Sequence, residues 1–157
     1  MTGGTVSPHI IKVSPMIMEI EQLMRLQAEQ KEIKIECLLK DSLSIYADSD
    51  MIRLVIRNLL SNAIKFTPYG GTVTVVTAAT ENDVEIIIKD TGEGMDDAML
   101  EKIRDSNYHT TQGTAGERGT GLGLMLCREF LIKNNGLLHI ESTKGKGSTF
   151  SFTLPVA

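Results

Sequence analysis

The sequence predicts a two-layer α/β sandwich, in which about three helices pack on a mixed, mainly antiparallel sheet of about five strands. Short β-prone runs occur mostly in pairs separated by brief turns, and helical patterns of apolar residues stand between these pairs. The length of 157 residues, with 41% hydrophobic and 23% charged residues, fits one folded domain with one core. We therefore expect residues 14–157 to form the domain and residues 1–13 to lead into it.

The first helix is predicted in the segment SPMIMEIEQLMRLQAEQKE, with Ser14 as its N-cap and Pro15 at its first helical position. The two short runs that follow, IKIECLL and LSIYA, are rich in residues that favour strands. The intervening KDS suits a turn, so these runs are expected to pair as a small hairpin.

The strongest helical pattern lies in DSDMIRLVIRNLLSNAIKF, residues 48–66. Its apolar residues recur at the spacing of one buried helix face, which comprises Ile52, Val55, Ile56, Leu59, Leu60 and Ala63. The following PYGG ends the helix, because a proline disfavours helical backbone at the residue before it and paired glycines suit a turn.

The second half of the chain contains two further hairpins and two further helices. Their strands are expected at residues 71–80, 83–90, 137–142 and 148–155, and their helices at residues 96–105 and 124–135. Gly136 is expected to close the last helix as its C′ glycine.

Residues 106–118 read SNYHTTQGTAGER, a polar segment that is long for a loop inside one domain. Loops of this length are usually functional lids or are disordered. Ordering the thirteen residues would cost on the order of ten kcal/mol, at about 1–2 kcal/mol each, with almost no apolar burial in return. We therefore predict a lid that is mobile until a phosphate ligand orders it.

The composition argues against several classes of protein. A net charge of -4, 4% aromatic residues and no tryptophan are atypical of a nucleic-acid-binding domain. The apolar runs are far shorter than the roughly 18 residues of a membrane helix and no signal peptide is recognisable, so we expect no direct membrane contact by this domain. Cys37 and Cys127 lack C-x-x-C spacing and are expected to be buried reduced thiols of a cytosolic protein.

Three polar residues of the helix at 48–66 form one stripe beside its apolar face. At about 100° per residue, Asn58, Asn62 and Lys65 fall within roughly 60° of one another. Carboxamide oxygens suit Mg²⁺ and a lysine suits phosphate, so the stripe could bind a metal-phosphate ligand. The alternative is an ordinary solvated flank, although two asparagines inside a helix are unfavourable without a further role.

Two glycine-containing segments supply further candidate contacts. In DTGEGM, Asp90 ends a strand and could accept from an exocyclic amine, while Gly92 and Gly94 let a flat ring approach the backbone; the alternative is a plain tight turn. In GTGLGL, residues 119–124, the glycines open a helix whose free N–H groups favour phosphate. Its spacing matches neither G-x-G-x-x-G nor a P-loop.

Four segments carry a resemblance to a known family, in this order and at these intervals: RNLLSNAIKFTPYGG, DTGEGM, GTGLGL and GKGSTFSFTLP. They resemble the N, G1, G2 and G3 boxes of the catalytic ATP-binding domain of sensor histidine kinases, over about residues 33–155. The resemblance implies the Bergerat fold, which these kinases share with gyrase, a heat-shock chaperone family and mismatch-repair ATPases. NAIKFTP and the ending GSTFSFTLP favour the kinase branch.

The resemblance implies roles at the adenine and metal ends of an ATP site. Asn62 would be the Mg²⁺ ligand, Asp90 would accept from the adenine amine, and Phe66 would lie beside the adenine or ribose. A hydroxyl of either Ser148 or Thr149 would support the adenine end. The full set implied to bind the nucleotide is Asn58, Asn62, Lys65, Phe66, Asp90, Gly92, Gly94, Met95, Gly119, Thr120, Gly121, Leu122, Gly123, Ser148 and Thr149.

At the phosphate end, the resemblance implies that Asn58 and Lys65 act near the phosphates as catalytic residues. The glycines of the third box would hinge the lid, and Arg118 would grip the γ-phosphate once the lid closes. The alternative for Arg118 is a solvated side chain. The F box of the family is not recognisable, because residues 100–119 contain no phenylalanine, and Tyr108 could substitute for it.

The implied reaction is transfer of the ATP γ-phosphoryl group to a histidine on a separate dimerisation domain, in a two-component system with a response regulator downstream. None of His9, His109 and His139 lies in a sequence like the phosphoacceptor box of the family, so that domain is expected to lie outside this chain. The parent is expected to be bacterial, with or without a membrane anchor, and this domain is expected to lie in the cytoplasm.

Two alternatives to an active kinase remain from the sequence. One is a module of the same fold that senses a nucleotide but transfers no phosphoryl group. The missing F box would be the sign of this loss of transfer. The other is an ATP-hydrolysing mechanochemical relative, which would require a water-activating acid in the N-box helix, where Asn58 stands instead.

Overall fold

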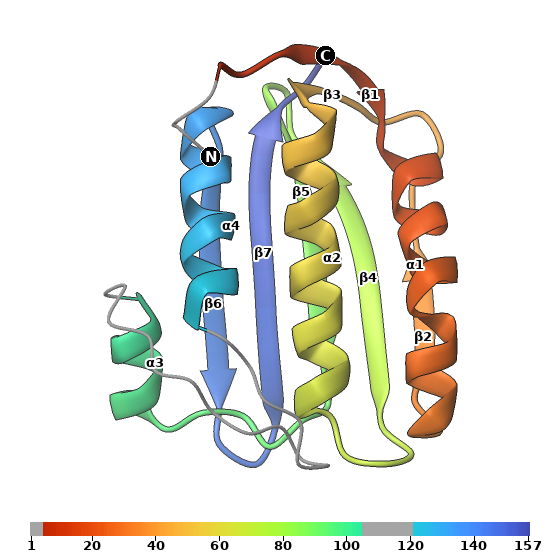
Figure 1. Cartoon of the computed structure of the whole chain (residues 1–157), viewed down its shortest axis with the longest axis vertical. Coiled ribbons are helices and arrows are strands. Elements are labelled where there is room, and N and C mark those ends of the chain that lie inside the picture. Colours follow the sequence, from red (N-terminus) through yellow and green to blue (C-terminus); the bar gives the residue numbers. More distant parts are fainter. Residues whose placement is uncertain (1–4, 105–120) are drawn as a thin grey trace.

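The computed structural model describes residues 5–104 and 121–157 (Figure 1). In chain order its elements are β1 (Pro8–Lys12), α1 (Val13–Gln30), β2 (Lys34–Leu38), β3 (Ser44–Asp48), α2 (Ser49–Phe66), β4 (Thr72–Ala79), β5 (Asp83–Asp90), α3 (Asp97–Arg104), α4 (Gly121–Lys133), β6 (Leu137–Thr143) and β7 (Gly147–Pro155). Five strands form one sheet in the order β2-β4-β5-β7-β6, and β1 and β3 form a separate two-stranded sheet. In the larger sheet only the β2–β4 pair is parallel.

The larger sheet and three helices form the two layers. Helices α1, α2 and α4 lie side by side over one face of the sheet, and α3 lies beside its β6 edge (Figure 1). The residues of β4 and β5 that face the helices are buried, as Val73, Val75, Ile86 and Ile88 illustrate. The predicted fold class, a mixed and mainly antiparallel sheet covered by helices, is therefore confirmed.

Helix α2 follows the sequence prediction closely. All six residues of the predicted apolar face are buried, and the helix ends at Phe66. Asp48 is its N-cap, and the Asp48 carboxylate accepts a hydrogen bond from the Met51 N–H at 3.2 Å. This cap satisfies one of the free N–H groups of the first turn.

The strand pairs agree with the prediction in the second half of the chain but not in the first. The β4–β5 and β6–β7 hairpins form as expected. The predicted hairpin of β2 with β3 is wrong, because β2 pairs with β4 and β3 pairs with β1. The partner of β3 lies at residues 8–12, within the segment that the sequence treats as a lead-in.

Two predicted helix caps are also wrong. Helix α1 begins at Val13 with Lys12 at the N-cap, so Ser14 already lies inside the helix. At the end of α4 the left-handed residue is Asn135, with a φ of 63°, and Gly136 is the next residue. Glycine is required there for a different reason: a Cβ at Gly136 would lie 2.4 Å from the Thr153 carbonyl oxygen.

Three further expectations concern single features. Cys127 is buried and Cys37 is half-buried, and both thiols are free. Within residues 5–104 and 121–157, no helix is both long and apolar enough to cross a membrane. The predicted lid at 106–118 lies outside the described residues.

The C-terminus of α2 provides a test of the packing between α1 and α2. Lys31 is 4% exposed, and its Nζ donates to the carbonyl oxygens of Ile64 and Lys65, both at 3.0 Å. Lys31→Met should lower the free energy of unfolding by about 1–3 kcal/mol, because it leaves carbonyls of the last helical turn without this charged donor. Lys34→Met is the matched control, since the Lys34 side chain is 72% exposed, and urea denaturation of both variants is the measurement. Equal losses in the two variants would contradict the capping role.

Candidate nucleotide site

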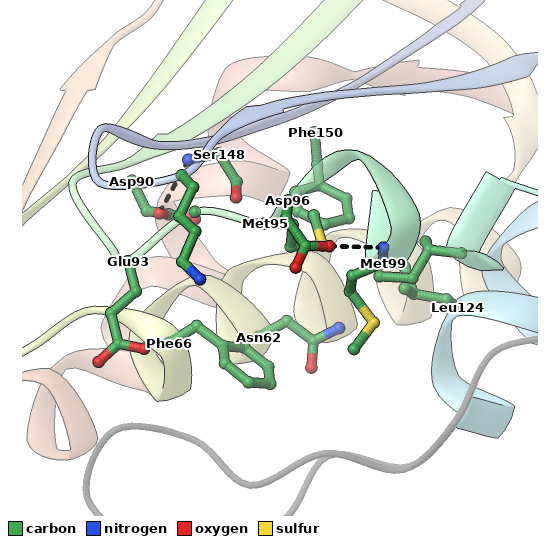
Figure 2. Close-up of a pocket in the computed structure, with 13 residues that line it drawn as sticks. Asn62, Phe66, Asp90, Glu93, Met95, Asp96, Met99, Leu124, Ser148 and Phe150 are labelled. Atoms are coloured by element: carbon green, nitrogen blue, oxygen red, sulfur yellow. Dashed lines mark hydrogen bonds between the residues drawn. The ribbon is translucent and has the colours of Figure 1, made fainter. Parts of the chain in front are cut away.

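A cavity of about 300 Å³ opens where α2, α3 and α4 meet the ends of β5 and β7. We call it the Asp90 cavity; it is lined by Asn62, Phe66, Asp90, Glu93, Gly94, Met95, Asp96, Met99, Ile103, Leu124, Lys144, Ser148 and Phe150. Asn62 and Phe66 on α2 lie across the cavity from Asp90, Ser148 and Phe150 on the strands (Figure 2). Its volume lies at the small end of the range of small-molecule sites.

Asp90, the last residue of β5, presents one carboxylate oxygen to the protein and leaves the other available. Its Oδ1 accepts from the Gly92 N–H at 2.8 Å and from the Ser148 N–H at 3.2 Å. Among the described residues, no hydrogen bond ends on its Oδ2. Because the Asp90 side chain lines the cavity and is only 8% exposed, Oδ2 is a fixed acceptor for a donor on a bound ligand.

Burial determines the ionisation of this carboxyl group. Removal from water raises the pKa of Asp90, and the hydrogen bonds from the Gly92 and Ser148 N–H groups oppose that rise in part. The net direction is upward, so the ionised form is less favourable in the folded chain than in the unfolded chain. A donor from a ligand would relieve this cost, because a hydrogen bond to the charged form favours it.

The two glycines after Asp90 are required by the approach of other backbone segments. A Cβ at Gly92 would lie 2.4 Å from the Phe66 carbonyl oxygen at the end of α2. Gly94 has a φ of 71°, and a Cβ there would lie 2.1 Å from the Thr143 carbonyl oxygen. Gly94 lines the cavity, whereas Gly92 contributes through its N–H to Asp90.

Ser142 connects this turn to the start of β7, and the sequence analysis missed it. Its Oγ accepts from the Met95 N–H at 2.7 Å, donates to the Gly147 carbonyl at 3.1 Å, and lies 2.8 Å from the Ser148 Oγ. The network holds the cavity wall at Met95 against the strand that supplies Ser148. No signal in the sequence distinguishes Ser142 from the other hydroxyl residues nearby.

The three polar residues predicted to form one stripe on α2 do not all reach the cavity. Asn62 lines the cavity, together with Phe66 one turn further on, but Asn58 and Lys65 do not. Asn58 instead lies close enough to Cys127 on α4 to lower the pKa of its thiol, and the Cys127 thiol itself donates to the Val55 carbonyl oxygen at 3.9 Å. Burial raises the pKa of the Cys127 thiol to about 11, so it remains protonated at neutral pH.

Strand alternation separates Ser148 from Thr149. Ser148 lines the Asp90 cavity with Phe150, two residues further along β7. Thr149 lines a second concavity of about 410 Å³, with Thr74, Lys89 and Glu141. Along their strands these residues alternate with the residues of the core, so they lie on the sheet face away from the helices. We call this second concavity the outer hollow. Asp90 and Ser148 line both concavities.

Apolar side chains make up much of the remaining wall. Met95 was predicted as part of the site, whereas Met99, Ile103, Leu124 and Phe150 were not. Met99 and Ile103 lie one turn apart on α3, and this spacing is the only feature of the sequence that could have placed them on one face. Apolar surroundings with one fixed acceptor suit a heteroaromatic ring that carries an amine.

Part of the predicted phosphate end lies outside the described residues: Arg118, Gly119, Thr120 and Tyr108. Gly121 and Leu122 belong to the first turn of α4, and Gly123 is half-buried there. Leu124, the last residue of GTGLGL, lines the Asp90 cavity. The segment therefore enters the cavity wall at its C-terminal end.

Comparison with known proteins defines the class. The family model described as "Histidine kinase-, DNA gyrase B-, and HSP90-like ATPase" matches residues 47–157, and the chain belongs to this family. Adaptive-response sensory kinase SasA of Gloeothece citriformis is 40% identical over 146 residues, which are 92% of this chain and 37% of that protein. Sporulation kinase A of Bacillus subtilis is 33% identical over 146 residues, 92% of this chain and 23% of that protein. The chain thus spans well under half the length of these relatives.

Solved structures share the fold. The nucleotide-free catalytic domain of histidine kinase ThkA superimposes with a TM-score of 0.82 at 24% identity, over 95% of each chain. Full-length ShkA in complex with AMPPNP gives a TM-score of 0.82 at 25% identity, over 99% of this chain and 32% of that chain.

The raised pKa of Asp90 predicts a pH dependence of stability. A carboxyl group whose folded pKa exceeds its unfolded value of about 3.8 favours folding at low pH and loses this contribution as the pH rises through the folded pKa. Asp90→Asn removes the titration, so the variant should gain stability relative to the wild type between about pH 3.5 and pH 7. Urea denaturation across this range measures the difference, with Asp83→Asn at the other end of β5 as the control. A stability difference independent of pH would refute the assignment.

Proposed function

We propose that this chain is the catalytic, ATP-binding domain of a sensor histidine kinase. The observation that carries the proposal is the Asp90 cavity, where a fixed carboxylate oxygen and the Asn62 carboxamide stand across an apolar space. The kinase relatives, 40% and 33% identical, support the kinase branch within the family.

The adenine is proposed to occupy the apolar part of the cavity. Its exocyclic amine would donate to Asp90 Oδ2, which has no other partner among the described residues. Phe66, Met95 and Phe150 would contact the ring, and Ser148 would support Asp90 through its N–H. Thr149 is left out of this proposal because it lines the outer hollow.

Asn62 is proposed to hold Mg²⁺ through its carboxamide oxygen. The donor chemistry fits, because Mg²⁺ prefers oxygen ligands and is usually bound by few protein groups together with water and phosphate oxygens. No side-chain hydrogen bond involves Asn62 within residues 5–104 and 121–157, so its carboxamide, which lines the cavity (Figure 2), is available. When bound, the ion would neutralise charge on the phosphates. Asn58, Lys65, Arg118 and the glycines of residues 119–123 are proposed to lie near the same phosphates.

The proposed reaction is in-line phosphoryl transfer to a histidine of a separate dimerisation domain. The bond between the γ-phosphorus and the bridging oxygen breaks, a phosphorus–nitrogen bond forms, and ADP leaves. This chain would contribute by positioning the nucleotide and excluding water. A response regulator receiver domain is the proposed next acceptor, since the histidine kinase ThkA, of similar fold, has been solved in complex with response regulator TrrA. We place the domain in the cytoplasm of a bacterial parent, which could be membrane-anchored.

Transfer of label tests the function directly. The chain, Mg²⁺ and ATP labelled on the γ-phosphate are mixed with the dimerisation domain of the parent kinase. Acid-labile, base-stable label on that domain is the expected result. ATP binding without transfer would instead indicate the nucleotide-sensing module, and failure to bind ATP would contradict both.

Asp90→Asn should weaken ATP binding by roughly 1–3 kcal/mol. The oxygen of the new amide would keep the hydrogen bonds from the Gly92 and Ser148 N–H groups, so its NH₂ group would face the adenine amine. Two donors would then face each other without an acceptor. Isothermal titration calorimetry with ATP is the measurement, and Asp83→Asn is the control for loss of one carboxylate. Unchanged affinity in Asp90→Asn would rule out the adenine assignment.

Asn62→Ala should lower ATP affinity in the presence of Mg²⁺ but leave the weaker binding in EDTA nearly unchanged, because the lost group is a metal ligand. Asn82→Ala, at an exposed asparagine in the β4–β5 turn, is the matched control. If both variants keep the full gain in affinity from Mg²⁺, Asn62 is not a ligand.

A further inference from the structure

The charges around the Asp90 cavity are unbalanced. Its described lining includes three carboxylates, those of Asp90, Glu93 and Asp96, and a single cationic side chain, that of Lys144. A phosphorylated nucleotide is strongly anionic, so three carboxylates oppose its binding. Lys144 supplies the compensating charge from within the described lining.

The backbone around Lys144 is fixed against the cavity wall. The Gly145 N–H donates to the Glu93 carbonyl at 2.6 Å, and the Lys146 N–H donates to the Thr143 carbonyl at 3.0 Å, which closes the β6–β7 turn. A Cβ at Gly94 would lie 3.1 Å from the Lys144 Cα. The turn therefore holds the Lys144 backbone beside a residue that itself lines the cavity.

The same turn contains a second lysine on the other side of the sheet. Lys146 lines the outer hollow with Lys89 and Thr149, and it does not line the Asp90 cavity. Lys144 and Lys146 are both exposed and lie two residues apart. They therefore differ mainly in which concavity they face, which makes them a matched pair.

We propose that Lys144 is an affinity determinant for the phosphates of the nucleotide, an inference that rests on the proposed function. A cavity of about 300 Å³ is roughly 8 Å across, which is close to the Debye length at physiological salt. The ammonium group therefore acts on charge throughout the cavity. It raises the affinity for ATP and ADP relative to adenosine, which fills the purine end but carries no phosphate.

Calorimetric titration of the wild type, Lys144→Met and Lys146→Met with ATP and with adenosine tests the proposal. Methionine keeps a long apolar stem and removes only the charge. Lys144→Met should lower ATP affinity about three- to tenfold, as expected for one exposed charge, and adenosine affinity less than twofold. Lys146→Met should change both less than twofold. Lys144→Arg should keep ATP affinity within about twofold, and about 0.5 M NaCl should shrink the effect of Lys144→Met because salt screens it.

Each outcome has a distinct meaning. Equal ATP affinities in Lys144→Met and Lys146→Met would overturn the inference while leaving the proposed function intact. An equal loss for ATP and adenosine in Lys144→Met would overturn it as well, because Lys144 would then contact the base or ribose. If the wild type bound no ATP, the proposed function itself would fail.

Discussion

The candidate site depends on one shared acceptor, the Oδ1 of Asp90. By accepting the N–H groups of Gly92 and Ser148, it joins the end of β5 to the turn that follows and to the start of β7. Because both bonds end on Oδ1, Oδ2 has no hydrogen-bond partner among the described residues and is available to a ligand. The arrangement carries a cost, because burial disfavours the ionised form and raises the pKa of Asp90. A ligand that donates to Oδ2 offsets part of that cost, which makes this residue a selective contact.

Helix α2 supplies the opposite wall, and its position is set at both ends. The Asp48 side chain caps its first turn, and Lys31, the residue that follows α1, donates to its last carbonyls. Between these ends a continuous apolar face is buried against the sheet. Asn62 and Phe66 lie at the margin of that face, half-buried, and therefore reach the cavity without leaving the helix. Packing of the core thus places the polar residues.

Local sequence predicts what depends on neighbours along the chain. The 3.6-residue pattern locates α2, the short turns locate both late hairpins, and Asp90 is identified as an acid at a strand end. Pairing between distant segments is not visible in this way, so the partners of β2 and β3 were assigned wrongly. The choice between Ser148 and Thr149 depends on which side chains of β7 point toward the helices. The contribution of Met99 and Ile103 depends on the position of α3 beside β6. Both depend on the tertiary structure and not on the local sequence.

The most direct test of the central claim is amide chemical-shift mapping of this chain during titration with Mg-ATP. If the nucleotide binds at Asp90, the largest changes among the described residues should fall on the Gly92 and Ser148 N–H groups, which share its Oδ1, and on residues around Asn62. The amides of Thr74 and Glu141, on the outer hollow, should change little. Changes concentrated at the outer hollow, with Gly92 and Ser148 unaffected, would contradict the assignment of the Asp90 cavity as the nucleotide site.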